Sequence, residues 1–306
     1  MLEALPLARI PWLVHGFSTS IGGVSCRDGS EPRKSGAERL LNLGHVPWDE
    51  PGRVKENRRR FFAAIDAAQM RYIGLRQFHS SMVRIFGDGQ SGGRKRTSTI
   101  PPAGAAPGPA DRAPARGDAL ATRARGILLT VQTADCSPIL LADTRKRVAA
   151  AIHAGWRGTA ARIAQKTIGD LRLHFGTRPE DVVAAIGPTI KGCCYEVGPD
   201  VAHEFGSQFA SAAEWFDGPF AALSTGDEPT PFAWLQHDPP GHERPKRVRL
   251  DLAAANRWQL EGAGVPAERI FVCGLCTSCQ ADWLFSYRRE GGHTGRLMAA
   301  IGKKRG

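Results

Sequence analysis

The stretch GILLTVQTADCSPILLADTRKRVAAAIHAG, residues 126–155, decides the fold class. It holds three short apolar runs, ILLTV, PILLA and VAAAI, and each run ends in turn-forming or polar residues, as buried strands do. The spacing leaves no room for a helix between the first and third runs. We therefore predict three adjacent antiparallel strands, of which the first and third run in the same direction.

The chain that follows alternates between helical and strand-like patterns. Apolar residues recur four apart at Ile163, Thr167, Leu171 and Phe175, which predicts an amphipathic helix with Thr159 as its N-terminal cap. Further strands are expected in DVVAAIGP (181–188), RIFVCG (269–274) and GRLMAAIG (295–302), and further helices in VAHEFGSQFASAAEWF (201–216) and LDLAAANRWQLEGAG (250–264). Gly262 and Gly264 would stop the last helix. Together these elements predict a mixed α/β fold, an α+β sandwich, without fixing the strand order.

Two polar segments interrupt this pattern, at about 91–117 and 218–247. Both are poor in large apolar side chains, so neither can bury enough surface to offset the entropy lost on ordering. Strand-like runs flank both segments. We therefore expect one domain over residues 1–306 that carries two flexible insertions.

Charge and cysteine content restrict the class of protein. Much of the formal charge of +11 sits in segment 91–117, at +4, and in the C-terminal Lys303, Lys304 and Arg305. No aromatic residues are interleaved with these charges to form a stacking platform, so we expect no specific nucleic-acid surface. Seven cysteines without an export signal or a membrane-spanning run indicate reduced thiols in a soluble cytoplasmic protein. The oligomeric state cannot be read from the sequence.

Three possible metal ligands fall at the ends of apolar runs: His79 in RQFHSS, Cys136 in TADCSP and His153 in HAGWRG. If the first and third predicted strands run the same way, Cys136 and His153 emerge at one sheet edge. Two imidazoles and a thiolate are the donors of a catalytic zinc site with one open position. These residues could equally be ordinary core residues, since buried Cys and His are common.

A metal-free alternative uses the same residues. Cys136 would be a thiolate nucleophile and His153 its base, with Asp118 or Asp135 orienting the imidazole, as in cysteine hydrolases. This alternative leaves His79 without a role, and Asp135 could simply cap a turn. A non-catalytic metal-binding or polyanion-binding protein is the third class.

The remaining cysteines give weaker signals. CGLCTSC (273–279) has the spacing of an iron–sulfur ligand run, but QADW follows where a fourth cysteine and a proline are needed, so we expect no iron–sulfur cluster. Adjacent Cys193 and Cys194 are expected to pack at a turn rather than to bind a metal. Single glycines in GDALAT and IGPTIKG form no dinucleotide or phosphate-loop fingerprint.

Motifs along nearly the whole chain resemble those of the YfiH-like family, also called laccase-domain or polyphenol oxidase family proteins. They occur in the same order as in that family: HGFSTSIGGVS (15–25), NLG (42–44), ENRRR (56–60), Gln77 with His79, GDALAT (117–122), TADCSPILL (133–141), HAGWRG (153–158), IGP with CCYEVG (186–198), LDL with AAN (250–256), and CTSC with FSYRREGGHTGRLMAAIG (276–302). HAGWRG, TADC and SYRR with TGR make the resemblance specific.

The resemblance implies a cytoplasmic purine nucleoside phosphorylase that uses phosphate to cleave adenosine, inosine, guanosine or methylthioadenosine and can deaminate adenosine. It implies Zn²⁺ on His79, Cys136 and His153, and a fold similar to the catalytic domain of the cytotoxic necrotizing factors. Copper is less suitable, because multicopper centres use His-x-His pairs and none of the nine histidines forms one.

Other residues of the motifs are candidates for substrate contacts and acid–base chemistry. Ser20 stands where family members often have arginine, so phosphate must be held by another cation. Arg157, next to a helix start whose free N–H groups attract anions, and Arg288 or Arg289 are the candidates. We also assign Gln77 to substrate binding. Asp135 is the candidate catalytic carboxylate, with Asp118 as its alternative.

Overall fold

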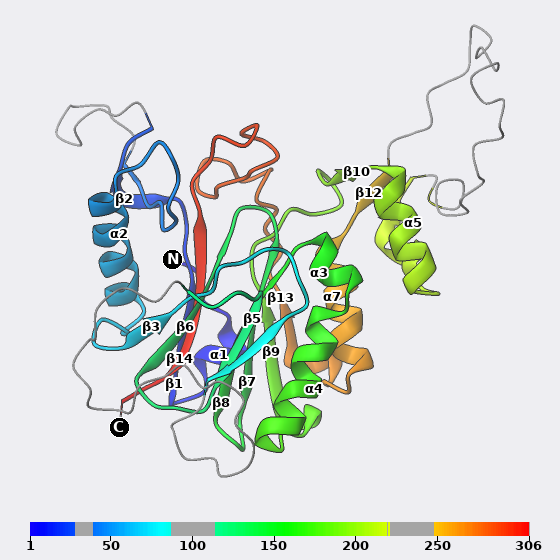
Figure 1. Ribbon diagram of the computed structural model, residues 1–306, viewed down its shortest axis with the longest axis horizontal. Helices are drawn as coiled ribbons and strands as arrows, with labels where there is room; N and C mark the ends of the chain where they lie inside the picture. Colours follow the sequence, from blue (N-terminus) through cyan, green and yellow to red (C-terminus); the bar gives the residue numbers. More distant parts are fainter. Residues whose placement is uncertain (28–38, 87–113, 219, 221–247, 306) are drawn as a thin grey trace, which may run out of the picture.

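The structure, a computed structural model, describes residues 1–27, 39–86, 114–218, 220 and 248–305 (Figure 1). The two predicted insertions, at about 91–117 and 218–247, lie almost wholly outside these residues. In the described part of the chain, no helix is long and apolar enough to cross a bilayer.

Two mixed β-sheets form the centre of the molecule, and helices cover the outer side of each sheet (Figure 1). The larger sheet has the order β13 (Ile270–Val272), β9 (Val182–Ile186), β7 (Ser137–Asp143), β8 (Val148–Ala154), β5 (Ala119–Thr122) and β4 (Val83–Phe86). The smaller sheet has the order β1 (Leu13–Phe17), β14 (Leu297–Lys303), β6 (Ile127–Thr133) and β3 (Arg71–Ile73). The predicted mixed α+β sandwich is therefore confirmed.

The outer face of the larger sheet packs against two helices, α4 (Ile163–Phe175) and α7 (Leu252–Gly262). Every second residue of β7 and β8, including Ile139 and Ile152, points to these helices and is fully buried. The intervening residues form the contact with the smaller sheet. Because β7 and β8 are buried on both faces, they read as continuous apolar runs rather than as alternating ones.

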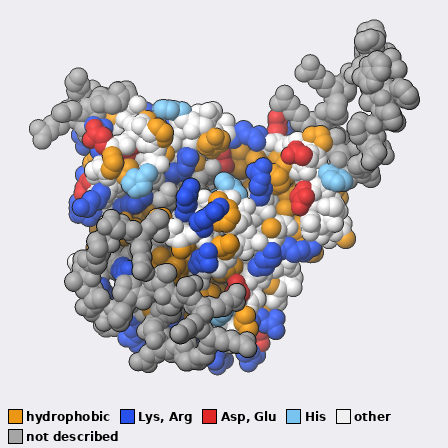
Figure 2. All heavy atoms as spheres, viewed as in Figure 1, with side chains coloured by type: hydrophobic (Ala, Val, Ile, Leu, Met, Phe, Trp, Pro, Cys, Tyr) orange, Lys and Arg blue, Asp and Glu red, His pale blue; other side chains and the backbone are white. Residues whose placement is uncertain are grey.

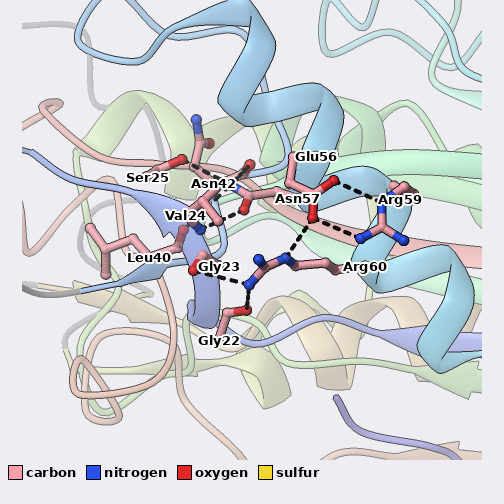
Figure 3. A network of polar contacts seen from close by, with 10 residues as sticks. All are labelled: Gly22, Gly23, Val24, Ser25, Leu40, Asn42, Glu56, Asn57, Arg59 and Arg60. Atoms are coloured by element: carbon pink, nitrogen blue, oxygen red, sulfur yellow. Dashed lines mark hydrogen bonds and ion pairs between the residues drawn. The ribbon is translucent and has the colours of Figure 1, made fainter. Parts of the chain in front are cut away.

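The outer face of the smaller sheet is covered by α2 (Pro51–Ala64), through Phe61 and Phe62. Asn57, fully buried on the same helix, ties it to the neighbouring chain (Figure 3). Its side chain accepts from the Val24 backbone N–H at 2.8 Å and donates to Ser25 Oγ at 2.8 Å and to the carbonyl oxygens of Leu40 and Asn42. This one side chain therefore joins α2, β2 (Ile21–Ser25) and the chain at 40–42.

A third sheet contains three short strands, β10 (Glu196–Val197), β12 (Val248–Leu250) and β11 (Phe216–Asp217). With α5 (Pro199–Gln208) it encloses a separate aromatic cluster: Phe205, Phe209, Trp215, Phe216 and Trp258. Short elements complete the fold: α1 (Leu5–Ala8), α3 (Trp156–Ala160), and 3-10 turns at Pro179–Asp181, Ala212–Trp215 and Ala267–Arg269.

The predicted three-strand meander is wrong in one respect. β7 and β8 are antiparallel neighbours, but β6 lies in the other sheet and pairs with β14 and β3. The chain crosses between the sheets at Ala134–Cys136. The apolar pattern of β6 fits either sheet, so its partner is decided by strands that are distant in the sequence.

Two predicted helices also differ from the structure. The helix after HAGWRG begins at Trp156, with Gly155 at its N-cap, and it breaks at Arg162, which has a left-handed conformation. Thr159 therefore caps nothing, and its hydroxyl accepts instead from Asn256 at 3.0 Å. The helix predicted over 201–216 ends at Gln208, because the aromatic cluster draws the rest of the segment into a turn and β11.

Candidate metal centre and active site

His79, Cys136 and His153 come together at one edge of the larger sheet. Their ligand atoms all lie within 4.8 Å of one another, and Cys136 Sγ is 3.8 Å from His79 Nε2. Cys136 immediately precedes β7, and His153 lies near the end of the antiparallel β8, opposite Pro138. The predicted convergence is therefore present, but it comes from the pairing of β7 with β8 and not from a meander.

Asp118 holds both histidines in place. Its carboxylate accepts from His153 Nδ1 at 2.9 Å, from the His79 backbone N–H at 3.0 Å and from the Ser80 backbone N–H and hydroxyl at 2.7 and 2.6 Å. With Nδ1 bonded to Asp118, His153 keeps Nε2 free for a ligand, as metal-binding histidines do. Burial raises the pKa of the Asp118 carboxyl, but the bonds from His153 and Ser80 outweigh it and lower the pKa to about 2. The fully buried group is therefore a carboxylate at neutral pH.

Gly155 leaves the space that the three side chains need. A Cβ at this position would lie 2.9 Å from Cys136 Sγ and 2.9 Å from His79 Cδ2. The backbone conformation of Gly155, with φ of −77°, is open to any residue. Its requirement for glycine therefore comes from the close approach of the metal-ligand candidates.

Two residues of the site have backbone conformations that L-residues rarely adopt. His79 has a φ of 61° and Asp135, next to Cys136, has a φ of 91°. Such conformations cost about 1–3 kcal/mol each and persist where the surroundings fix them, which is frequent in functional sites. Here Asp118 fixes His79, and Asp135 is fixed through its carbonyl oxygen by the backbone N–H of Ile190 at 2.9 Å.

The protonation of the thiol and the imidazole is coupled. Burial raises the pKa of Cys136, but His153 and His79 lower it to about 6. Burial lowers the pKa of His153, but Cys136 and Asp118 raise it to about 9. At neutral pH the protein without a metal therefore holds a thiolate next to an imidazolium.

These donors fit a zinc ion. A thiolate and two imidazoles are borderline-soft ligands, one of them is oriented by a carboxylate, and the shared space is kept open by Gly155. His79 is exposed and Cys136 is half-buried, so one side of the group opens to solvent. Three protein ligands with an accessible fourth position are the pattern of a catalytic site rather than a structural one.

The other predicted site residues lie around this centre with distinct contacts. Gln77 uses both ends of its amide on the Gln132 backbone, at 2.8 Å each, and so fastens the loop of His79 to the end of β6. Asp135 accepts from Thr277 Oγ1 at 2.6 Å and from the Arg288 backbone N–H at 2.7 Å. Both of its carboxylate oxygens thus anchor the chain around residues 277 and 288.

The candidate arginines lie on exposed loops or on a short helix. The Cζ atom of Arg157 lies 4.2 Å from the centre of the Trp156 ring. The Cζ atom of Arg288 lies 5.3 Å from the centre of the Tyr195 ring, and the Arg288 side chain donates to the Glu196 carbonyl at 2.7 Å. Arg289 donates to the Ser278 carbonyl at 2.9 Å. Among the described residues, none of the three forms an ion pair with a carboxylate. On the face shown in Figure 2, Lys and Arg side chains spread over the centre.

Sequence reasoning missed two contributions to this site. Burial raises the pKa of Tyr195, and the negative charge of the nearby Cys136 raises it further, while Arg288 opposes the shift. Ser80 binds Asp118 through its hydroxyl. Tyr195 belongs to the motif CCYEVG, which could have pointed to it. Nothing in the sequence indicated that Ser80 faces Asp118.

The chain is similar to known proteins over nearly its whole length. Residues 14–304 match the family model described as multi-copper polyphenol oxidoreductase laccase. A purine nucleoside phosphorylase of Deinococcus radiodurans is 39% identical over 98% of this chain and 94% of that protein, and the adenosine deaminase RL5 of an unknown prokaryote is 31% identical over 99% of each. The crystal structure of YlmD from Geobacillus stearothermophilus superposes with a TM-score of 0.70 at 28% identity, covering 99% of this chain and 94% of that one. The chain therefore belongs to the multi-copper polyphenol oxidoreductase laccase family, with YfiH-like and YlmD-like proteins as its relatives.

Proposed function

We propose that this protein is a zinc-dependent purine nucleoside phosphorylase that also deaminates adenosine. The observation that carries the proposal is the convergence of His79, Cys136 and His153 around one accessible position. It occurs in a chain similar to proteins named purine nucleoside phosphorylase and to one named adenosine deaminase. Residues 1–306 would act as one cytoplasmic catalytic domain, with insertions at about 91–117 and 218–247.

The substrates would be adenosine, inosine, guanosine and methylthioadenosine, with phosphate as co-substrate. Zinc, when bound, supplies a Lewis acid that lowers the pKa of a coordinated water towards about 7. Asp118 keeps His153 in the tautomer that presents Nε2 and holds the His79 loop. The protein's own contribution is thus a centre that needs little reorganisation during reaction.

Arg157 and Arg288 would bind the anion and the nucleoside. Arg157 belongs to α3, which starts beside Gly155, and its guanidinium has no carboxylate partner among the described residues. Arg288 is positioned through its own backbone N–H on Asp135. Because Asp135 already anchors Thr277 and Arg288, we assign it a role in orienting the site during catalysis, and Gln77 supports the substrate side of the His79 loop.

Two observations weigh against the copper oxidase activity in the family's description. The nine histidines include no His-x-His pair, whereas multicopper centres need many imidazoles. The candidate centre has only two imidazoles and one thiolate. Zinc is therefore the proposed metal.

The test is incubation of the zinc-loaded protein with adenosine, with and without phosphate. Release of adenine that depends on phosphate is the result expected of phosphorolysis, and formation of inosine is the result expected of deamination. A chelator should abolish both activities, and added zinc should restore them. The proposal fails if neither product forms with the zinc-loaded, folded protein.

A cysteine hydrolase remains the second candidate. It is supported by the contacts of His153 with Cys136 and with Asp118, which are those expected of a base between a nucleophile and an orienting carboxylate. The pKa of Cys136, lowered to about 6, favours a thiolate at neutral pH. Hydrolysis of an ester or amide that survives the chelator and is blocked by alkylation of Cys136 would favour this candidate. Zinc-dependent nucleoside turnover would exclude it as the main activity.

A further inference from the structure

A second group of potential metal ligands lies outside the candidate active site. Cys193, Cys194, Cys276 and Cys279 bring their sulfur atoms within 4.8 Å of one another. Cys279 Sγ is 3.6 Å from Cys193 Sγ and 3.4 Å from Cys194 Sγ. The two groups share no residue, so the four cysteines need a role of their own.

The fold explains why cysteines more than 80 positions apart meet here. β9 and β13 are parallel neighbours, with Val272 opposite Ile186. Their carboxyl ends therefore lie at the same edge of the sheet, and the segment after β9 carries Cys193 and Cys194 while the segment after β13 carries Cys276 and Cys279. A bridge between Thr189 and Cys276 and the bond from the Thr277 N–H to the Thr189 carbonyl at 3.1 Å align the two segments.

We propose that these four cysteines bind a structural zinc ion. Four thiolates are the donor set of closed tetrahedral zinc sites, and the pair Cys276 and Cys279 has the C-x2-C spacing found in them. A Zn–S bond of about 2.3 Å in a tetrahedron separates the sulfur atoms by about 3.8 Å. The separations of 3.6 and 3.4 Å are close to that value, so one ion can reach the sulfurs after small shifts.

An iron–sulfur cluster does not fit the same group. In a [4Fe–4S] cluster each cysteine binds a different iron atom, and in a [2Fe–2S] cluster the four cysteines are divided between two iron atoms. In either cluster some of the sulfurs would lie much further apart than the 4.8 Å that spans all four here. The expectation for Cys193 and Cys194 was incomplete: they lie in a turn, but their sulfurs face Cys279.

The surroundings of the sulfurs suit the charge of such a site. Four thiolates around a divalent ion leave a net charge of −2. Arg289, whose side chain donates to the Ser278 carbonyl at 2.9 Å, supplies positive charge next to it.

The ion would fasten a wall of the candidate active site. Cys194 directly precedes Tyr195, and Thr277, next to Cys276, donates to Asp135 at 2.6 Å. Arg288 joins the two segments by donating to the Glu196 carbonyl and to Asp135. Locking Cys193 and Cys194 to Cys276 and Cys279 would therefore fix the loops that carry Tyr195 and Arg288.

Zinc content of purified protein tests the proposal. Wild type, prepared with reductant and zinc, should hold about two zinc ions per chain, and His79→Ala and Cys279→Ser should each hold about one. Cys273→Ser, which changes a cysteine of the same segment outside the group, should keep both ions. Retention of full zinc content by Cys279→Ser, or loss of all zinc in His79→Ala, would overturn the proposal.

Two further measurements keep the test decisive if Cys279→Ser fails to fold. X-ray absorption of zinc in the double variant His79→Ala, Cys136→Ser should show only sulfur neighbours, at about 2.3 Å. Nitrogen or oxygen neighbours would contradict the four-cysteine site. A disulfide between Cys194 and Cys279 in the zinc-treated protein, detected by mass spectrometry without reductant, would contradict it as well. The X-ray absorption result is independent of the proposed catalysis, because its variant lacks two ligands of the candidate active site.

Discussion

His153 Nδ1 and Asp118 Oδ1 lie 2.9 Å apart, and the His153 backbone N–H also binds the Asp118 carbonyl at 2.7 Å. Asp118 thus holds His153 at two points: its carbonyl oxygen binds the His153 backbone, and its carboxylate binds the His153 imidazole. The same carboxylate receives the N–H groups of Phe78, His79 and Ser80. Both histidines of the candidate centre therefore depend on Asp118.

We predict that Asp118→Asn weakens zinc binding by about 10- to 100-fold, because the amide cannot accept from His153 and from three backbone N–H groups at once. Competition with a chelating dye measures the affinity. Asp143→Asn is the matched control, since Asp143 is a fully buried carboxylate at the far end of β7. Equal zinc affinity in the Asp118→Asn variant and wild type would remove Asp118 from the metal centre.

Gly155→Ala should disturb the centre without unfolding the protein. The new Cβ would meet Cys136 Sγ and His79 Cδ2 at 2.9 Å, so at least one ligand must move. A shift of about 1 Å at a reacting centre costs about 100-fold in rate, and we expect nucleoside turnover to fall by about that factor. Gly169→Ala, where a Cβ meets nothing within 4 Å, should leave turnover unchanged. A fully active Gly155→Ala would show that the close approach is unimportant.

Asn57→Ala should destabilise the fold and leave the chemistry of the site intact. The substitution strands the Val24 N–H and the carbonyl oxygens of Leu40 and Asn42, each a buried or partly buried polar group. One such group costs about 1–3 kcal/mol, so the free energy of unfolding should fall by at least this amount. Urea unfolding measures it. Arg59→Ala, on the exposed side of the same helix (Figure 3), is the control and should have little effect.

The stability of the fold should depend on pH through His15. Burial lowers the pKa of His15 to about 4 from its usual 6.5, so the folded protein keeps this imidazole neutral where the unfolded chain protonates it. Between pH 6.5 and 4 the unfolded state binds more protons, and stability is lost as pH falls, by up to about 1.4 kcal/mol per pH unit. Urea unfolding at several pH values should show a shallower decline for His15→Gln than for wild type. Identical slopes would exclude His15 as a source of the dependence.

The sequence predicted where the strands lie in the chain better than it predicted which strands pair with one another. The apolar runs of β7, β8, β9, β13 and β14 are strands as expected, because burial on both faces leaves a continuous apolar signal. The sheet of β6 could not be predicted, because its partners, β14 and β3, are set by contacts distant in the sequence. The break at Arg162 was also hidden, since a left-handed residue between two helical segments has no apolar pattern of its own.

The candidate site shows the same division. His79, Cys136 and His153 were identified from residue type and position at run ends, and the structure brings them together. The sequence could not choose between Asp118 and Asp135 as the orienting carboxylate. That choice depends on the pairing of β5 with β8, which sets Asp118 beside His153 and leaves Asp135 to Thr277 and Arg288. The four-cysteine group was missed because its halves meet only through the parallel pairing of β9 and β13.

Phosphate-dependent release of adenine from adenosine, compared between wild type and Cys136→Ala at equal amounts of folded protein, tests the proposed centre most directly. Removing the thiolate leaves two imidazoles, too few ligands for a stable catalytic zinc site. We expect zinc-loaded wild type to release adenine and the variant to fall to the background rate together with the loss of its zinc from this centre. Undiminished adenine release by Cys136→Ala would contradict the assignment of catalysis to His79, Cys136 and His153.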